Sequence, residues 1–235
     1  MKYLSGYILY LMVVIFGGTA ILKHVKSQDS YIRQRVVQLQ SERGGCSGIQ
    51  IQVPSGKVYT LTAKHCYGLL ENGKIKSTNE QGKSEMISFV AIDDKADLLL
   101  LTAPAHALSI QVGLKMDKHE HIHTITHGAL FPSYRTDGEI LEELTIHAAL
   151  FPIMEPDDFE RCLANKMEPI MDMDLGIICA MSENVMMTTA MVAPGSSGGP
   201  MLNEAGDLVG IVSVSSGPFS GMVPIQDIQD FLVGK

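Results

Sequence analysis

The chain has 235 residues, of which 46% are hydrophobic and 19% are charged, and its formal net charge is −8. This composition can bury one large core or two small ones, which excludes an intrinsically disordered chain. The acidic balance also disfavours a nucleic-acid partner, because phosphate binding requires a concentration of Lys and Arg that the sequence lacks.

Residues 3–22 carry no charge and are numerous enough to cross a bilayer as a helix, so we predict a signal-anchor in residues 1–22. A cleaved signal peptide is the alternative, because Gly18-Thr19-Ala20 offers the small residues that a signal peptidase reads. A buried core helix is disfavoured by the uninterrupted lack of charge. Residues 30–42 then show an approximately helical spacing with Ser30 as cap, and residues 23–43 are predicted to be a helical stalk or linker.

Short strands and turns are predicted next, over residues 44–115. Alternating residues at 48–53, a turn at 54–57 and a partner strand at 58–62 form a hairpin that ends just before His65. A polar loop is predicted at 71–83 and a strand at 86–92. Asp97 and the four leucines that follow it indicate a buried strand.

A second group of strands is predicted over residues 120–225, followed by a closing helix at 226–233 whose apolar residues share one side. No internal repeat or low-complexity tract interrupts this pattern, which indicates an all-β architecture. The candidate strands of the second group are 122–126, 139–147, 175–180, 185–190, 199–202 and 208–214.

Three short strings carry side chains suited to nucleophilic catalysis: Thr62-Ala63-Lys64-His65-Cys66, Asp97 with its leucines, and Gly195-Ser196-Ser197-Gly198-Gly199-Pro200. A serine hydroxyl is a poor nucleophile at neutral pH, so it needs a base within hydrogen-bond reach and an acceptor on the other nitrogen of that base. Taken singly, the serine indicates a turn, the histidine a core residue and the aspartate a cap. Together, in the order His, Asp, Ser, they predict a catalytic triad of His65, Asp97 and Ser197.

Over residues 44–235, and through these three strings, the chain resembles the trypsin/chymotrypsin superfamily of serine proteases. The stretch 195–225 is most similar to the bacterial HtrA-type branch. The resemblance implies two six-stranded antiparallel β-barrels, at about 44–115 and 120–225, with a C-terminal helix and, here, an N-terminal transmembrane helix. HtrA-type enzymes usually carry a PDZ domain, for which we expect no room after residue 225.

The resemblance also assigns the oxyanion hole to the amides of Gly195 and Ser197, which must converge on the developing charge. Ser196 departs from the trypsin branch, which has an Asp there that pairs with a newly cleaved amino terminus. Activation by that route is therefore not expected.

The primary pocket departs from trypsin as well, because Met191 stands where trypsin uses an Asp to hold Lys or Arg. With Met191 at its base, the pocket is predicted to be apolar and to accept small or medium residues such as Val, Ala, Leu or Met. One wall would also pair with the substrate backbone by strand addition. The expected wall and closing residues are Ser213, Val214, Ser215 and Gly221.

The cysteines and the basic residues after the predicted span favour opposite sides of the membrane for the catalytic domain. The resemblance implies a disulfide between Cys46 and Cys66 and allows a second between Cys162 and Cys179, which favours an extracytoplasmic catalytic domain. Four buried free thiols are the alternative. Lys23, Lys26, Arg33 and Arg35 follow the span and favour a cytoplasmic domain. We predict a single-pass membrane protein with an extracytoplasmic domain; secretion after cleavage and a cytoplasmic domain remain alternatives.

His119, His121 and His123 alternate and would share one face of a strand. A His-x-His pair can hold zinc, but no carboxylate or thiolate motif accompanies it, so an exposed polar face is predicted, with no metal or other cofactor.

The sequence thus predicts a membrane-tethered serine endopeptidase that acts on protein or peptide substrates, in an oligomeric state left open. A catalytically inactive scaffold or chaperone that binds peptides is the alternative. An esterase is disfavoured, because nothing resembles the Gly-x-Ser-x-Gly elbow of that class.

Overall fold

The computed structural model describes residues 28–93, 95–113, 115–117, 119–128, 133–144, 185–216 and 219–235. The predicted membrane span at 3–22 and the predicted strand at 175–180 lie outside these residues. Within the described ranges, no helix combines the length and the apolar character needed to cross a membrane.

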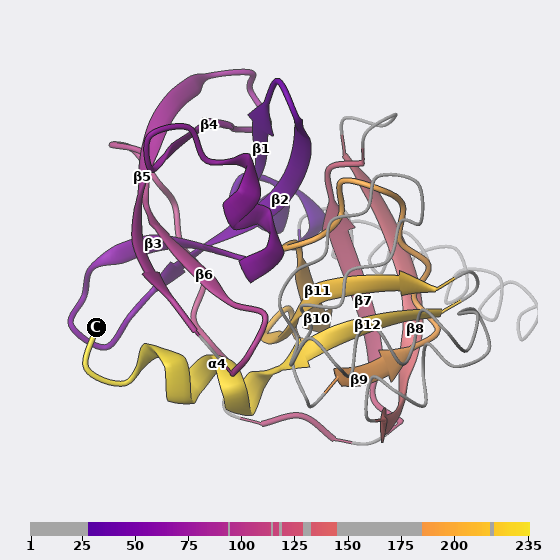
Figure 1. Ribbon diagram of the computed structural model, residues 1–235. Helices are drawn as coiled ribbons and strands as arrows, with labels where there is room; N and C mark the ends of the chain where they lie inside the picture. Colours follow the sequence, from indigo (N-terminus) through magenta and orange to yellow (C-terminus); the bar gives the residue numbers. More distant parts are fainter. Residues whose placement is uncertain are drawn as a thin grey trace, which may run out of the picture.

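The first half of the chain forms a closed antiparallel barrel (Figure 1). Neighbouring strands follow the order β1-β2-β3-β6-β5-β4 around the barrel. The strands are β1 (Val36–Ser41), β2 (Gly44–Gln52), β3 (Val58–Thr62), β4 (Lys74–Thr78), β5 (Ser84–Ile92) and β6 (Leu99–Thr102).

The leucine run explains why the first three residues of β6 are buried on both faces of the strand. Leu99 and Leu101 pack inside the first barrel, whereas Leu98 and Leu100 pack in a second cluster shared with the other barrel. A strand buried on both faces needs apolar residues at every position. The prediction of a buried strand here is confirmed.

Two predictions for this barrel are wrong. Residues 36–41, assigned to the helical stalk, form β1, so the barrel begins at Val36. Among the described residues of the predicted stalk, only 28–33 are helical. Val37 and Leu39 alternate into the barrel core, and this strand period prevails over the helical spacing. The predicted loop at 71–83 contains β4, in which Ile75 is the single apolar residue that faces the core.

The second half forms another closed antiparallel barrel, ordered β10-β11-β12-β9-β8-β7, and the chain ends in a helix. The predicted double barrel with a C-terminal helix is therefore confirmed. Its elements are β7 (His121–Thr126), β8 (Tyr134–Leu144), β9 (Val185–Thr188), β10 (Pro200–Asn203), β11 (Leu208–Ser216), β12 (Phe219–Pro224) and α4 (Ile225–Leu232).

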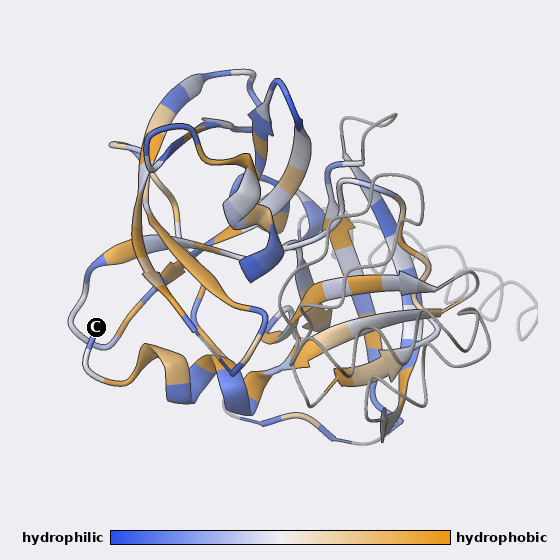
Figure 2. Ribbon diagram, in the orientation of Figure 1, coloured by the Kyte–Doolittle hydropathy of each residue, from blue (hydrophilic) through white to orange (hydrophobic). Residues whose placement is uncertain are grey.

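The largest apolar cluster joins the two barrels. It contains Ile51 and Leu100 from the first barrel and Leu202 and Ile211 from the second, together with the buried side of α4. Figure 1 shows α4 running from the end of β12 beneath the first barrel, and Figure 2 shows hydrophobic and hydrophilic residues alternating along it. Burial of this shared cluster holds the barrels together and so fixes the loops that meet between them.

Candidate active site

His65 and Asp97 are brought together by the pairing of β3 with β6. His65 is the second residue of the 3-10 helix η1 (Lys64–Leu69), which follows β3, and Asp97 lies two residues before β6. The imidazole Nδ1 lies 2.9 Å from Asp97 Oδ2, and the backbone N–H of His65 donates to Oδ1 at 2.9 Å. From the second barrel, the Ser213 hydroxyl donates to Oδ2 at 2.6 Å. The carboxylate therefore fixes the ring and leaves Nε2 as the nitrogen available to a nucleophile.

The two groups shift each other's pKa in opposite directions. Burial alone would lower the pKa of His65, but the charge of Asp97 and its hydrogen bond outweigh burial and raise that pKa above its usual value. Burial alone would raise the pKa of Asp97; the charge of His65 and the hydrogen bonds from His65 and Ser213 outweigh it and lower that pKa. Asp97 thus stays ionised while fully buried, as an orienting carboxylate requires.

Ser197 lies in the loop between β9 and β10, which packs against the segment just before His65. The carbonyl oxygen of Ser197 accepts from the backbone N–H of Ser47 at 2.8 Å, across the two barrels. A Cβ on Gly198 would lie 1.9 Å from Thr62 Oγ1 and 2.8 Å from the backbone nitrogen of Ala63. Only glycine fits this approach, and φ is +82° there. The serine loop and the histidine loop are therefore in direct contact.

In the described part of the chain, no hydrogen bond joins the Ser197 hydroxyl to the His65 ring. This nucleophile–base contact is often long in free enzymes and shortens when substrate binds. The structure thus brings together two of the three predicted residues directly and the third through contact between its loop and theirs.

The N–H of Gly195, one of the two predicted oxyanion-hole amides, lies on a turn closed by a hydrogen bond from the N–H of Ser196 to the carbonyl oxygen of Ala193, at 3.0 Å. The N–H of Ser197 lies on the next turn, closed by a hydrogen bond from the N–H of Gly199 to the carbonyl oxygen of Ser196, at 2.9 Å. Gly195 has φ +94°, a conformation that favours glycine. Among the hydrogen bonds of the described residues, neither the N–H of Gly195 nor that of Ser197 donates to another protein group. Both amides are therefore free to bind an oxygen atom of a ligand.

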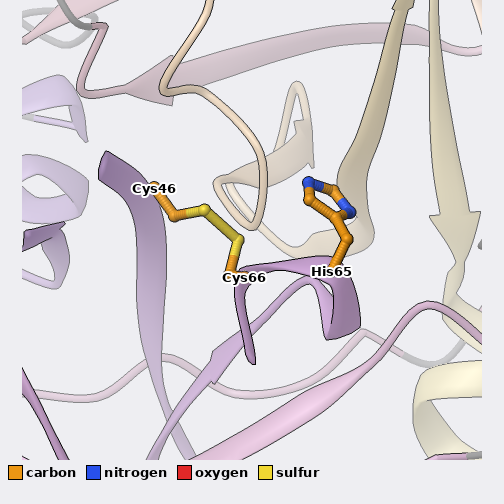
Figure 3. A group of neighbouring side chains, drawn as sticks. All are labelled: Cys46, His65 and Cys66. Carbon is orange, nitrogen blue, oxygen red and sulfur yellow. A yellow bond between two sulfur atoms is a disulfide. The ribbon is translucent and has the colours of Figure 1, made fainter. Parts of the chain in front are cut away.

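Cys46 and Cys66 form a disulfide, as the resemblance implied. Figure 3 shows this bond beside the ring of His65, and the potential ligand atoms of the three residues lie within 4.8 Å of one another. A metal would require thiolates, and both sulfur atoms are already joined to each other. The disulfide instead ties β2 to η1. Cys162 and Cys179 lie outside the described residues.

Comparison with known families identifies the fold. Residues 46–211 match the trypsin-like peptidase domain family. The chain belongs to that family. It is accordingly a serine-type endopeptidase by family, and the expected resemblance to trypsin-like enzymes is confirmed. No curated protein matches the sequence.

Solved structures of several proteases share the fold of this chain at low identity. The inactive form of the protease Rv3671c, a protein of M. tuberculosis, has 15% identity and a TM-score of 0.62, with 88% of this chain and 93% of that one covered. A serine endoprotease from Yersinia pestis has 18% identity, TM-score 0.60 and coverage of 88% and 66%. The HtrA-type protease AlgW, solved with a tripeptide, has 17% identity, TM-score 0.61 and coverage of 88% and 62%.

The expected specificity residues of this trypsin-like peptidase differ in exposure. Met191, which was expected at the base of the primary pocket, is 58% exposed, and its place in that pocket stays a prediction. Gly221 pairs with Val214, and a Cβ at position 221 would lie 2.6 Å from Val214 Cγ1. Ser213 is turned towards Asp97, and Ser215 is exposed.

The three histidines do not form the exposed strand face that was predicted. His119 lies before β7 with φ +60°, and His121 is exposed on β7, 3.5 Å from Glu139 Oε1. His123 is only 3% exposed, and its Nε2 has no hydrogen-bond partner among the residues that the structure describes. Burial lowers the pKa of His123, and the positive charge of the neighbouring Arg135 lowers it further. Arg135 is itself ion-paired with Asp29 and Asp137. The same face of the strand is therefore open at one histidine and covered at the next.

Sequence reasoning did not single out Ser47 or Tyr134, although both contact the nucleophile loop. Ser47 follows Cys46 directly, and this adjacency is the one signal in the sequence that points to it. Tyr134 offers no such signal, because its partners are distant in the chain.

Proposed function

We propose that this peptidase hydrolyses peptide bonds through His65, Asp97 and Ser197. The observation that carries the proposal is the buried Asp97–His65 pair on a loop that packs directly against the Ser197 loop. His65 Nε2 accepts the hydroxyl proton as Ser197 Oγ attacks the substrate carbonyl, and the imidazolium then gives that proton to the leaving amine. Water repeats the two steps on the acyl-enzyme and releases the acid.

The oxyanion is held by the free amides of Gly195 and Ser197, and the charge of Asp97 stabilises the imidazolium. Removing one such amide donor typically costs about 3 kcal/mol of transition-state stabilisation. Asp97 performs its role without accepting a proton, because its lowered pKa keeps it ionised.

We also propose that substrates are protein or peptide segments that pair with β11. β10 pairs with β11 only as far as Ile211, whereas β11 continues to Ser216. The second half of β11 therefore has an edge on which an extended peptide can add as a strand. We propose small or medium apolar residues before the scissile bond, because Val214 lies against Gly221 and neither residue can pair with a cationic side chain.

The membrane tether is a further part of this proposal. The uncharged residues 3–22 are numerous enough to span a bilayer. The disulfide between Cys46 and Cys66 supports an extracytoplasmic catalytic domain, because disulfides persist in oxidising compartments. Protease digestion of intact cells that carry a C-terminal tag would test this: loss of the tag supports the orientation, and protection of the tag contradicts it.

Labelling with a fluorophosphonate probe tests the catalytic assignment. We expect the full chain to be labelled and Ser197→Ala and His65→Ala to lose labelling. Ser55→Ala, at an exposed turn of the first barrel, is the matched control and should be labelled like the parent. A properly folded parent chain that is not labelled would favour the alternative of an inactive peptide-binding scaffold.

A peptide library then tests specificity. We expect cleavage after Val, Ala, Leu or Met, and a profile dominated by Arg or Lys would refute the apolar assignment.

A further inference from the structure

The loop that carries the nucleophile, residues 193–199, is held on one side by hydroxyl groups of the second barrel. The Ser196 side chain is fully buried, and Thr126 Oγ1 donates to its hydroxyl at 3.0 Å. The phenol oxygen of Tyr134 also shares a hydrogen bond with the Ser196 hydroxyl. The same phenol oxygen accepts from the backbone N–H of Ala193 at 2.7 Å. One tyrosine oxygen therefore holds the loop on both sides of Gly195.

Tyr134 is itself well fixed. It pairs with Thr126 in the ladder between β7 and β8, so the two residues that contact Ser196 stand on adjacent strands. The backbone at Gly128 approaches its ring so closely that an added Cβ would lie 2.9 Å from the ring edge. The position of the phenol oxygen is therefore set by the second barrel and not by the loop.

The first barrel holds the opposite side of the loop through Ser47. The backbone N–H of Ser47 donates to the carbonyl oxygen of Ser197 at 2.8 Å, and its hydroxyl donates to the carbonyl oxygen of Gly195 at 2.9 Å. The N–H of His127 donates to the same hydroxyl at 2.9 Å. A hydroxyl has one proton to give, and the carbonyl of His127, at 3.3 Å, is the more distant acceptor. The proton therefore goes to Gly195.

These hydrogen bonds hold the backbone on both sides of each of the two oxyanion-hole amides. The peptide group with the N–H of Gly195 lies between the N–H of Ala193, held by Tyr134, and the carbonyl of Gly195, held by Ser47. The peptide group with the N–H of Ser197 lies between the buried side chain of Ser196 and the carbonyl of Ser197, again held by Ser47. The carbonyl of Ser196, which belongs to the same peptide group as the N–H of Ser197, also accepts from the N–H of Gly199 at 2.9 Å, so rotation of that group would break this bond. The bonds to Tyr134 and Ser47 hold the backbone on both sides of the Gly195 peptide group.

We propose that Tyr134 and Ser47 are positioning residues that, with Ser196, hold the oxyanion loop ready for catalysis through neutral hydrogen bonds. This inference rests on the proposed function for its catalytic consequence. Among the described residues, the hydrogen bonds that hold the loop join hydroxyl and backbone groups, so these bonds do not depend on an ion pair with a newly formed amino terminus. We call Ser47, Tyr134 and Ser196 the hydroxyl clamp.

Steady-state kinetics of Tyr134→Phe in the full chain provide the first test. The substitution removes one oxygen atom, and Tyr59→Phe, on β3 of the first barrel, is the matched control. We expect kcat to fall by about 10- to 100-fold with KM within about twofold, because misplaced oxyanion donors affect the transition state more than substrate binding. We expect Tyr59→Phe to keep the parental kcat. An unchanged kcat for Tyr134→Phe would overturn the proposal.

A double-mutant cycle separates positioning from general destabilisation. If Tyr134 acts through Ser196, then Tyr134→Phe combined with Ser196→Ala should lower kcat by much less than the product of the two single effects. Multiplicative effects would show that the two residues act independently and would contradict the clamp. A peptide boronate, which forms a tetrahedral adduct with the serine, should lose affinity in parallel with kcat, whereas a product peptide should not.

Hydrogen exchange gives a readout that does not depend on catalysis. In the Ser197→Ala background, Tyr134→Phe and Ser47→Gly should each speed amide exchange within residues 193–199, and Tyr59→Phe should not. Unchanged exchange in both clamp variants would overturn the proposal even if the chain proves inactive. Absence of turnover and labelling in the parent chain would instead refute the proposed function, so the two failures are distinguishable.

Discussion

Replacing Cys46 with alanine removes the disulfide that joins β2 to η1, and the cost can be worked from the loop that it closes. The two cysteines are 20 residues apart in sequence. Closing a loop of that length in the unfolded chain contributes about 3 kcal/mol by the chain-entropy estimate. We therefore expect the free energy of unfolding to fall by about 3 kcal/mol and Tm to fall by roughly 2–4 °C for each kcal/mol lost.

Urea and thermal unfolding followed by circular dichroism measure this loss in the free energy of unfolding. A second substitution, at Cys66, measures the separate contribution of side-chain packing. The cross-link is already lost in Cys46→Ala, so adding Cys66→Ala reports only the buried sulfur atom of Cys66 in the core of the first barrel. The second step should therefore cost clearly less than the first. A first step below about 1 kcal/mol, or two equal steps, would refute the loop-closure argument. The same pair of variants at Cys162 and Cys179 tests the second disulfide that the resemblance allows.

Three further outcomes follow from the titrating groups and their partners. Because His65 must be neutral to act as a base and its pKa is raised, kcat/KM should increase with pH through an apparent pKa above 6.5; an acid limb at or below that value would contradict the Asp97 interaction. Burial lowers the pKa of His123 to about 4, so the unfolded chain binds the extra proton and the free energy of unfolding should fall by about 3 kcal/mol as pH decreases from about 6.5 to about 4. A His123→Gln variant should lose this slope in urea titrations, and an unchanged slope would assign it to other groups. Ser213→Ala removes a hydrogen bond to the buried Asp97 carboxylate and should lower the unfolding free energy at pH 7 by about 1.5–3 kcal/mol, a loss that should shrink as acid protonates the carboxylate.

The all-β architecture was predictable from local patterns, and the double barrel from the resemblance that the three catalytic strings carry. The strand pair that delivers His65 alternates cleanly and is separated by a turn, and the leucines after Asp97 match a strand buried on both faces. The residues of the nucleophile loop are constrained by chemistry as well as by folding, since a serine with convergent amides needs glycines around it. Such motifs can be recognised from the local sequence, without knowledge of the rest of the chain.

The missed strands show where local signals fail. In β1 the adjacent residues Val36 and Val37 are both buried, one towards the shared core and one inside the barrel, so the segment mimics a helical spacing. In β4 only Ile75 is apolar, and a strand with a single core residue reads as a polar loop. His123 illustrates a related limit, because alternation assigns a face but does not say what covers it.

The geometry of the site depends on contacts between the barrels, and this is the part that sequence reasoning could not supply. Ser213 reaches Asp97 across 116 residues of chain, and Ser47 reaches Gly195 across 148. No periodicity links residues so far apart, and serine is an ordinary residue in any strand. The base and the nucleophile lie in unusual local sequence motifs. The residues that position them are ordinary side chains, and they contact the catalytic groups only after the barrels pack together. A search for function in a single sequence therefore finds the reacting groups before it finds the groups that position them.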